Sequence, residues 1–395
     1  MTKPSPLSAE SYLSRARALA PLIEENADET ERSRRLSPAV VEALIDGGFY
    51  RMLQPTSLGG AELSLADFAA VIEELAKSDA STAWCIGQCG ACAMASAYLD
   101  PETAAEVFCP PDGIVAWGPP APSEARMVDG GYQVTGKWKF ASGSYQATWL
   151  GAQSFVTDRD GTPQKRDTGA PVIRTMLIPR AQVQIDDNWN VIGLKGTRTD
   201  GYSVTNLFVP NRFSFGRDEA PDRREDGLLF KFSTSNVYSV GFAALALGIA
   251  RRMLDDATAT AAGKTAYGTK TSMRDNNVVQ AQIGRSEAAL RSARTYLYAT
   301  THALWQAMAE TPTLSNEQKI EIRLASTWAI QQATGVADTV YHMVGSTAIF
   351  EAEPFERRFR DIHTVAQQIQ GRQSHFENVG QALLGLDPDA ALFTT

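Results

Sequence analysis

The sequence predicts a mostly helical α+β protein in which a β region separates two helical regions. Apolar residues recur at helical spacing from Ser8 to about Leu99. From Gly113 to about Phe215 short apolar runs alternate with turns rich in glycine and proline. The helical pattern returns at Leu228. We therefore expect an N-terminal helical domain over residues 1–112, a β-barrel or sandwich over 113–215, a linker over 216–227 and a four-helix bundle over 228–395.

The composition is that of a soluble globular protein with more than one subdomain. The chain has 395 residues, of which 44% are hydrophobic, and a net charge of −8. This acidic balance disfavours nucleic acid and anionic membranes as partners. No apolar run is long enough to span a bilayer, and Met1–Pro6 lacks the apolar core of a signal peptide. We therefore expect a cytoplasmic protein with no membrane partner.

The N-terminal region carries a clear helix start. Ser64 and Asp67 have the spacing of a capping pair, and Leu65, Phe68 and Ile72 then follow at helical spacing. The preceding stretch, Gln54–Gly60, is rich in turn-forming residues and predicts a loop. A helix is therefore expected to begin at about residue 65.

Three of the four cysteines share one helix face in the same region. Cys85, Cys89 and Cys92 are spaced by four and three residues. A zinc site would need a further ligand nearby, but the histidines stand far away in the sequence. We interpret these cysteines as small buried residues and expect no metal. The four histidines are His302, His342, His363 and His375.

The β region contains one stretch around which the chain is organised, Asp129–Gly143. Asp129-Gly130-Gly131 is turn chemistry, and bulky residues then alternate up to Phe140. Six strands are expected: Ile114–Trp117, Tyr132–Phe140, Trp149–Val156, Arg174–Ile178, Val183–Asp186 and Ser203–Val209. Taken alone, the stretch would be an ordinary β-meander. In the C-terminal region we expect helices over Ala243–Ala262, Val278–Ala299, Glu317–Gly335 and Val336–Met343.

The segment Trp138–Gly143, of the form Trp-x-Phe-x-Ser-Gly, resembles the segment that lies against the flavin in the acyl-CoA dehydrogenase superfamily. It is most similar to the oxygenase branch, the two-component flavin-dependent monooxygenases. Four more segments resemble this superfamily over most of the chain: Lys77–Trp84, Trp189–Arg198 with Arg198 in place of the last family glycine, Lys264–Gly268, and Thr347–His363 with its Arg-Asp-x-His ending.

The resemblance implies a fold, a cofactor and partners. The fold is a helical domain, a β domain and a four-helix bundle, usually assembled as a homotetramer. No Gly-x-Gly-x-x-Gly follows an expected strand, so a built-in NAD(P)H site is not expected. The resemblance then implies that reduced FMN or FAD comes from a separate NAD(P)H:flavin reductase. It reacts with O₂ through a C4a-hydroperoxyflavin and oxygenates a small molecule.

One comparison favours oxygenation over dehydrogenation. Dehydrogenases of the superfamily commonly place a glutamate base about nine residues after the arginine of Arg-Asp. That position here is Ile369, flanked by Gln368 and Gln370, none of which can remove a carbon-bound proton. Some dehydrogenases carry the base on another helix, so oxidation of an acyl thioester remains an alternative, and a non-catalytic flavin-binding homologue is a second.

The resemblance also assigns site residues. Ser142 is the catalytic residue, expected to bond flavin N5, although a turn serine is the structural alternative. Trp84, Trp117 and Phe140 are expected to form apolar walls, unless they are plain core. The cofactor-binding set is Trp117, Trp138, Phe140, Ser142, Lys264, Gln280, Gly345 and Gln367, and the substrate-binding set is Trp84, Cys92, Trp117, Gln368 and His375.

Two substitutions bear on the substrate class. Phenol-hydroxylating relatives carry a histidine where this chain has Cys92, and a Gln-His pair where it has Gln367-Gln368. Neither replacement exchanges protons near neutral pH. His375 either compensates or, the interpretation we favour, lies on a helix surface. We expect a substrate that needs no deprotonation: an indole-like ring, a sulfide or an amine.

Overall fold

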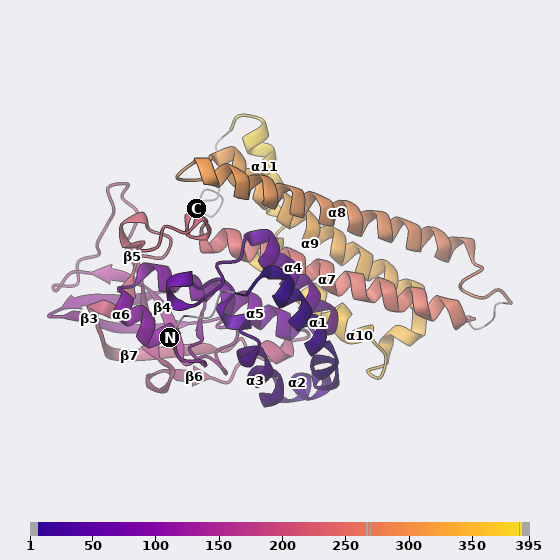
Figure 1. Cartoon of the computed structure of the whole chain (residues 1–395), viewed down its shortest axis with the longest axis horizontal. Coiled ribbons are helices and arrows are strands. Elements are labelled where there is room, and N and C mark those ends of the chain that lie inside the picture. Colours follow the sequence, from indigo (N-terminus) through magenta and orange to yellow (C-terminus); the bar gives the residue numbers. More distant parts are fainter. Residues whose placement is uncertain (1–6, 266–267, 269, 387, 389–395) are drawn as a thin grey trace.

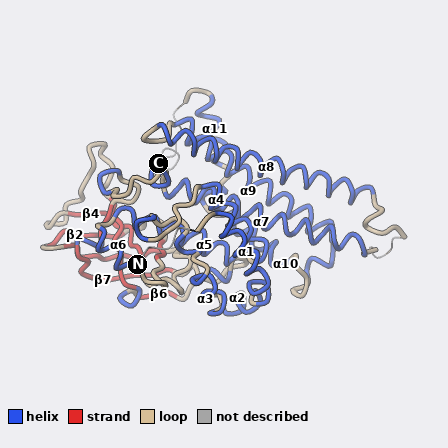
Figure 2. The backbone as a smooth tube through the Cα atoms, viewed as in Figure 1, coloured by secondary structure: helices blue, strands red, loops and turns tan. Residues whose placement is uncertain are grey.

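Helices form both ends of the chain and strands form its middle. The computed structural model describes residues 7–265, 268, 270–386 and 388. In Figure 1 the strands gather at one end of the molecule, and three long C-terminal helices run away from them. Figure 2 shows the same separation of the red sheet from the blue helices. The mostly helical α+β fold is therefore confirmed.

The N-terminal helices surround one fully buried helix. Ser64 caps the fourth helix, since its Oγ accepts a hydrogen bond from the Asp67 backbone N–H at 3.1 Å. All residues of the next helix, α5, are buried, and α5 packs against both the sheet and the C-terminal bundle. The six helices are α1 (Ala9–Glu25), α2 (Ala27–Ser33), α3 (Pro38–Asp46), α4 (Leu65–Ser78), α5 (Ala80–Ala93) and α6 (Pro101–Phe108).

The strands form one mixed eight-stranded sheet in the order β6-β7-β3-β2-β4-β5-β8, with β1 beside β4. All six expected strands are present. Ser123–Val128 was missed because only Ala125 of this strand is fully buried, which leaves little apolar signal. The strands are β1 (Val115–Trp117), β2 (Ser123–Val128), β3 (Gly131–Trp138), β4 (Trp149–Thr157), β5 (Ile173–Pro179), β6 (Gln184–Asp186), β7 (Gly201–Pro210) and β8 (Ser214–Phe215).

The C-terminal helices pack lengthwise. The expected break between Gly335 and Val336 is wrong, because α9 runs through both. Gly335 is exposed, and packing of α9 on α7 and α8 outweighs the roughly 1 kcal/mol penalty of a glycine within a helix. The helices are α7 (Thr234–Gly263), α8 (Asn277–Glu310), α9 (Asn316–Val344), α10 (Glu356–Ala366) and α11 (Ser374–Leu383).

Helix α7 is the centre of the bundle. By length and composition it is the one helix of the described residues that could cross a membrane, but 83% of its most apolar window is buried inside the protein. Its N-terminus is tied to the segment that we expected as a linker, since the Thr234 backbone N–H donates to Asp218 Oδ1 at 2.9 Å. This contact fixes the start of α7 next to the sheet.

Candidate active site

Helix α5, the end of strand β3 and helix α7 meet at one point. Trp84 Nε1 on α5 donates a hydrogen bond to Ser142 Oγ at 2.8 Å. The Trp84 ring stacks on Phe242 of α7, with centroids 4.0 Å apart and an interplanar angle of 13°. All three side chains are buried. The three regions of the chain thus converge on the residue that the sequence singled out as catalytic.

The Ser142 hydroxyl belongs to a hydrogen-bonded chain whose direction can be deduced. Thr197 Oγ1 donates to the Leu194 carbonyl oxygen at 2.8 Å, so its only hydrogen is committed. Thr199 Oγ1, 2.7 Å away, must therefore donate to Thr197. By the same logic Ser142 donates to Thr199, also at 2.7 Å. Since Ser142 accepts from Trp84, it retains one free lone pair and no free hydrogen.

Phe140 departs from the alternation expected of its strand. Trp138 is fully buried, whereas the Phe140 ring is 56% exposed. The cause is a φ of +65° at Phe140, a conformation that bulky residues rarely adopt. Gly118 permits this path, because a Cβ there would lie 1.7 Å from the Lys139 carbonyl oxygen. An aromatic face is thus presented two residues before Ser142.

Trp138 itself lies in the core of the β domain. Its ring stacks on Tyr202 at 5.3 Å, and its Nε1 donates to the Gln153 carbonyl oxygen at 3.0 Å. Every polar and apolar part of this side chain is occupied within the sheet. We therefore correct the expectation that Trp138 faces a cofactor: its ring lies in the core of the β domain, and the positive φ of Phe140 takes only the latter ring to the surface.

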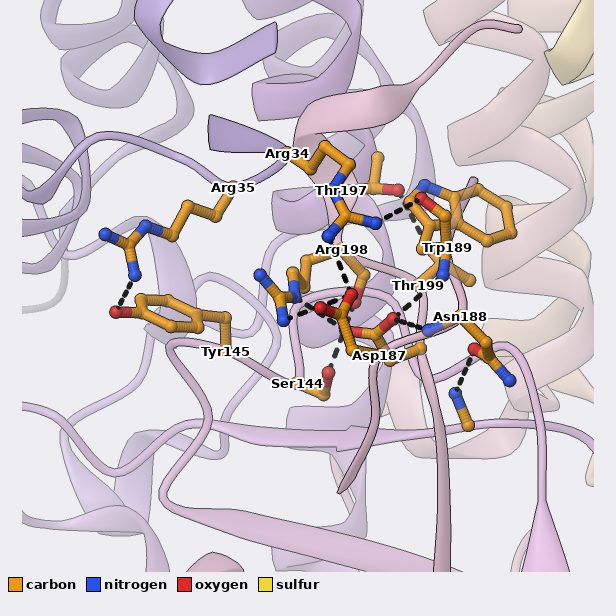
Figure 3. A network of polar contacts seen from close by, with 12 residues as sticks. Arg34, Arg35, Ser144, Tyr145, Asp187, Asn188, Trp189, Thr197, Arg198 and Thr199 are labelled. Atoms are coloured by element: carbon orange, nitrogen blue, oxygen red, sulfur yellow. Dashed lines mark hydrogen bonds and ion pairs between the residues drawn. The ribbon is translucent and has the colours of Figure 1, made fainter. Parts of the chain in front are cut away.

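The loop that carries Thr197 and Thr199 is held by charged side chains (Figure 3). Arg198 adopts a φ of +44°, so the arginine keeps the left-handed backbone typical of the glycine it replaces. Its carbonyl oxygen accepts from Ser144 Oγ at 3.2 Å, and its guanidinium pairs with buried Asp200 at 2.7 Å. These contacts hold Arg198 in a left-handed conformation that favours glycine.

A buried carboxyl group supports the same loop from α10. Asp361 Oδ1 accepts a hydrogen bond from the Leu194 backbone N–H at 2.6 Å. Burial, with the nearby charge of Asp79, raises the pKa of Asp361 to about 7. The Leu194 carbonyl oxygen in turn accepts the hydrogen bond of the Thr197 hydroxyl. The Arg-Asp motif therefore positions the hydroxyl chain that ends at Ser142.

On the side facing α7, Cys92 contacts a tyrosine that the sequence gave no reason to select. Tyr238 Oη lies 3.5 Å from Cys92 Sγ and 2.8 Å from Gln88 Nε2. Gln88 Nε2 also lies 3.1 Å from the Trp117 carbonyl oxygen. Burial raises the pKa of the Cys92 thiol to about 12, so it is uncharged at neutral pH. Trp117 is buried, and its Nε1 has no partner among the described residues.

The cysteines form no metal centre in the part of the chain that the structure describes. Cys85, Cys89 and Cys92 are buried and free, and burial raises the pKa of each thiol. Within the described ranges no group of three potential ligands gathers. The cysteine face instead packs α5 against the serine loop, since Cys89 Sγ lies 3.9 Å from the Ser142 carbonyl oxygen.

The residues that follow α10 occupy different environments. Gln367 is exposed and lines a cavity of about 470 Å³ together with His363 and Arg372. Gln368 is half-buried: its Oε1 accepts from the Gln370 backbone N–H at 2.9 Å, and its Nε2 has no partner among the described residues. Of the two glutamines, Gln368 therefore has the inward-facing amide.

His375 is buried against α9, so our preferred surface interpretation is wrong. Its Nδ1 lies 3.1 Å from Thr327 Oγ1, because α11 starts at Ser374 and packs on α9. Burial, together with the charge of Arg323, lowers the pKa of His375 to about 4. The imidazole is therefore neutral near pH 7, and its contacts are with α9 rather than with Ser142 or Cys92.

Three expected cofactor residues lie at the opposite end of the bundle. Lys264 Nζ donates to the Val344 carbonyl oxygen at 2.6 Å, next to Gly345 with its φ of +63°. Gln280 Nε2 binds the Arg274 carbonyl oxygen at 2.9 Å on the same side. Because 22 residues of α7 separate Phe242 from Lys264, the two are about 33 Å apart. One copy of the chain therefore does not bring Lys264 to Ser142; Ala266 and Tyr267 of this motif lie outside the described residues.

The sequence and the fold are similar to those of known flavoproteins. The N-terminal domain model of acyl-CoA dehydrogenases matches residues 14–104, and the C-terminal domain model matches residues 240–372. An indole-3-acetate monooxygenase of Pseudomonas putida is 30% identical, over 91% of this chain and 90% of the relative. The HsaA oxygenase subunit of a flavin-dependent monooxygenase of Rhodococcus jostii is 28% identical, over 89% of this chain and 92% of the relative.

Solved structures agree with the sequence matches. The HsaA monooxygenase of M. tuberculosis superposes with a TM-score of 0.86 at 25% identity, over 98% of this chain and all of that one. XiaF of Streptomyces sp., in complex with FADH2 and glycerol, has the same fold, with a TM-score of 0.88 at 22% identity and 97% coverage of both chains. The chain therefore belongs to the acyl-CoA dehydrogenase superfamily, within its branch of two-component flavin-dependent monooxygenases.

Proposed function

We propose that this protein is the oxygenase component that places one oxygen atom of O₂ on a small, electron-rich aromatic substrate at Ser142. The observation that carries this proposal is the contact of Trp84 with Ser142 beside the exposed ring of Phe140. A buried hydroxyl, an exposed aromatic face and an apolar wall make a site for a flat ring with a polar edge. Reduced flavin and O₂ supply the reactive oxygen there.

The residues present fit a reduced flavin. Because Ser142 donates its hydrogen to Thr199, its remaining lone pair can only accept a hydrogen bond. Reduced flavin carries a hydrogen on N5, so the serine would hold that proton in place and orient the ring. The exposed Phe140 ring offers a stacking surface. The unpartnered Nε1 of Trp117 is a further donor near the site.

The described residues around the site would exclude water, and neither Cys92 nor His375 would act as a base there. Trp84 and Phe242 form a stacked, buried wall. Cys92 keeps its proton near neutral pH, and His375 is neutral and turned to α9. Gln368 can orient a substrate without titrating. This set favours oxygen transfer to a neutral, indole-like or heteroatom-containing ring over proton removal from an acyl thioester, and the relative that acts on indole-3-acetate supports it.

The cofactor phosphates call for a second copy of the chain. Lys264 lies about 33 Å along α7 from Phe242, and Gln280 and Gly345 lie on the same side as Lys264. They would serve the flavin of a neighbouring subunit in a homotetramer. Both FMN and FAD suit this arrangement. Each carries phosphate, and a lysine binds phosphate as a point charge without a fixed geometry. Trp117, Phe140, Ser142 and Gln367 would belong to the subunit that holds the ring.

Electrons would come from a separate NAD(P)H:flavin reductase in the cytoplasm, since the sequence has no dinucleotide fingerprint. The test is turnover by the purified chain with NADH, flavin and O₂, with and without an added flavin reductase. We expect product only with the reductase. Flavin reduction at catalytic rates by NADH and the purified chain alone would contradict the two-component assignment.

A further inference from the structure

Arg323 on α9 is a buried cation without a carboxylate partner. Its side chain is 94% buried and faces α7 and the segment after α10. Its Nη1 donates to Gln370 Oε1, and no ion pair is formed by Arg323 within the described part of the chain. Burial lowers its pKa to about 10, so it stays charged at neutral pH. Arg358, by contrast, is also largely buried but has a carboxylate partner, since its Nη1 lies 3.2 Å from Asp256 Oδ2.

Apart from Gln370 Oε1, the polar groups considered beside Arg323 can donate hydrogen bonds. Gln370 Oε1 already accepts from Ser239 Oγ at 2.7 Å as well as from Arg323. Ser326, one turn along the same face of α9, has a fully buried hydroxyl with no partner among the described residues. The inward amide nitrogen of Gln368, two residues before Gln370, is also unpartnered among the described residues. What completes this cluster must therefore bring oxygen acceptors and a negative charge.

This cluster borders the proposed oxygenation site. Ser239 of α7 directly follows Tyr238, whose hydroxyl contacts Cys92 at 3.5 Å. Phe242, one turn further along α7, stacks on Trp84. Gln368 shares its short segment with Gln370 and hydrogen-bonds its backbone. Ser239 thus stands within one turn of α7 from both Tyr238 and Phe242, which links the cluster to the aromatic wall.

We propose that Arg323, with Ser326 and Gln368, binds a carboxylate carried by the aromatic substrate. The inference rests on the proposed function and adds the substrate's charge to it. A carboxylate matches the fork of a guanidinium with two oxygens. One guanidinium and two neutral donors balance one negative charge, so a doubly charged phosphate would remain uncompensated. His375 adds no charge to the cluster, because its imidazole is neutral and bonded to Thr327.

The test compares how tightly the full-length protein binds indole-3-acetate and its neutral amide. Binding is measured in the absence of flavin from the change in tryptophan fluorescence. Wild type should bind the acid more tightly than the amide. Arg323→Met should weaken acid binding about 30-fold or more and leave amide binding unchanged. Arg323→Lys should keep part of the preference. Arg372→Met, which removes an exposed arginine nearby, is the matched control and should bind as wild type does.

Ser326→Ala is a second variant that removes only a hydroxyl, and it should weaken the acid and not the amide. Failure of wild type to prefer the acid, or an intact preference in Arg323→Met, would overturn the carboxylate site. The delay in H₂O₂ release after reduced flavin meets O₂ can be measured without substrate. It is therefore measured separately on the same preparations. A normal delay in H₂O₂ release without acid preference would remove this inference and leave the oxygenase assignment standing.

Discussion

Trp84 Nε1 lies 2.8 Å from Ser142 Oγ, and this contact joins the buried helix α5 to the end of strand β3. It also determines what Ser142 can do. With the indole hydrogen received and its own hydrogen given to Thr199, the serine is an acceptor toward any ligand that reaches it. The chemistry of the site therefore depends on residues far apart in sequence.

The first prediction concerns this serine. Ser142→Ala should speed H₂O₂ release from reduced flavin and O₂ about ten- to a hundred-fold, because one hydrogen bond worth roughly 1–3 kcal/mol is lost. Rapid-mixing absorbance and a peroxide assay measure it. Ser154→Ala, which changes a buried serine of β4 outside the site, is the control. Equal release rates in both variants and wild type would show that Ser142 is a turn serine with only a structural role.

The second prediction concerns the direction of the hydroxyl chain. Thr199→Val keeps the shape of the side chain but removes the acceptor of the Ser142 hydrogen. Ser142 would then be free to turn its hydrogen toward the ring, so H₂O₂ release should accelerate, by less than in Ser142→Ala. A variant that behaves as wild type would show that Ser142 does not need this acceptor.

The third prediction separates Phe140 from Trp138. Phe140→Ala should weaken reduced-flavin binding without lowering the melting temperature, because the ring is 56% exposed in the free protein. Trp138→Ala should lower the free energy of unfolding by about 3–5 kcal/mol, as expected for a large buried side chain. Thermal melts and flavin titrations of both variants measure this contrast. A large loss of stability in Phe140→Ala would place that ring in the core.

The sequence predicted the fold because its helical and alternating patterns are long. Family motifs pointed to Ser142 and Trp84, which the structure brings into contact. It did not reveal Phe140's exposure, because nothing in the alternation signals a φ of +65°. It missed Thr199 and Tyr238, whose contacts with Ser142 and Cys92 cross 57 and 146 residues and follow from tertiary packing alone.

Lys264 and His375 are residues that the sequence did select but whose surroundings it could not predict. A motif placed Lys264 with the cofactor, but the length of α7 puts it far from Ser142 within one chain. His375 stands in a short amphipathic helix, and its burial depends on how α11 meets α9. Only three-dimensional packing decides such positions.

The fourth prediction concerns Asp361 and the pH dependence of stability. The pKa of this buried carboxyl is raised to about 7, against about 4 in an unfolded chain. Between these values the folded state holds a proton that the unfolded chain has lost, so the free energy of unfolding falls as pH rises. Asp361→Asn removes this titration and keeps an oxygen for the Leu194 N–H. Its melting temperature relative to wild type should rise from pH 4 to 7; a constant difference would contradict the assignment.

The fifth prediction concerns the pH dependence of oxygen transfer. Burial raises the pKa of Cys92 to about 12, and burial with the charge of Arg323 lowers that of His375 to about 4. Neither group changes charge between about pH 6 and 8, the window of an ordinary histidine. In the Asp361→Asn background, which removes a buried carboxyl whose pKa is raised into this window, the single-turnover rate should be flat there. A sharp inflection that disappears in His375→Ala would restore a histidine base.

The central claim is that this chain holds reduced flavin at Ser142 and protects its reaction with O₂. The most direct measurement mixes the purified protein with chemically reduced FMN or FAD and O₂, without substrate, and follows flavin absorbance and H₂O₂ together. We expect oxidation in two phases, with H₂O₂ released late and only in the second phase. Oxidation in one phase, at the rate of free flavin and with immediate H₂O₂, would contradict the claim.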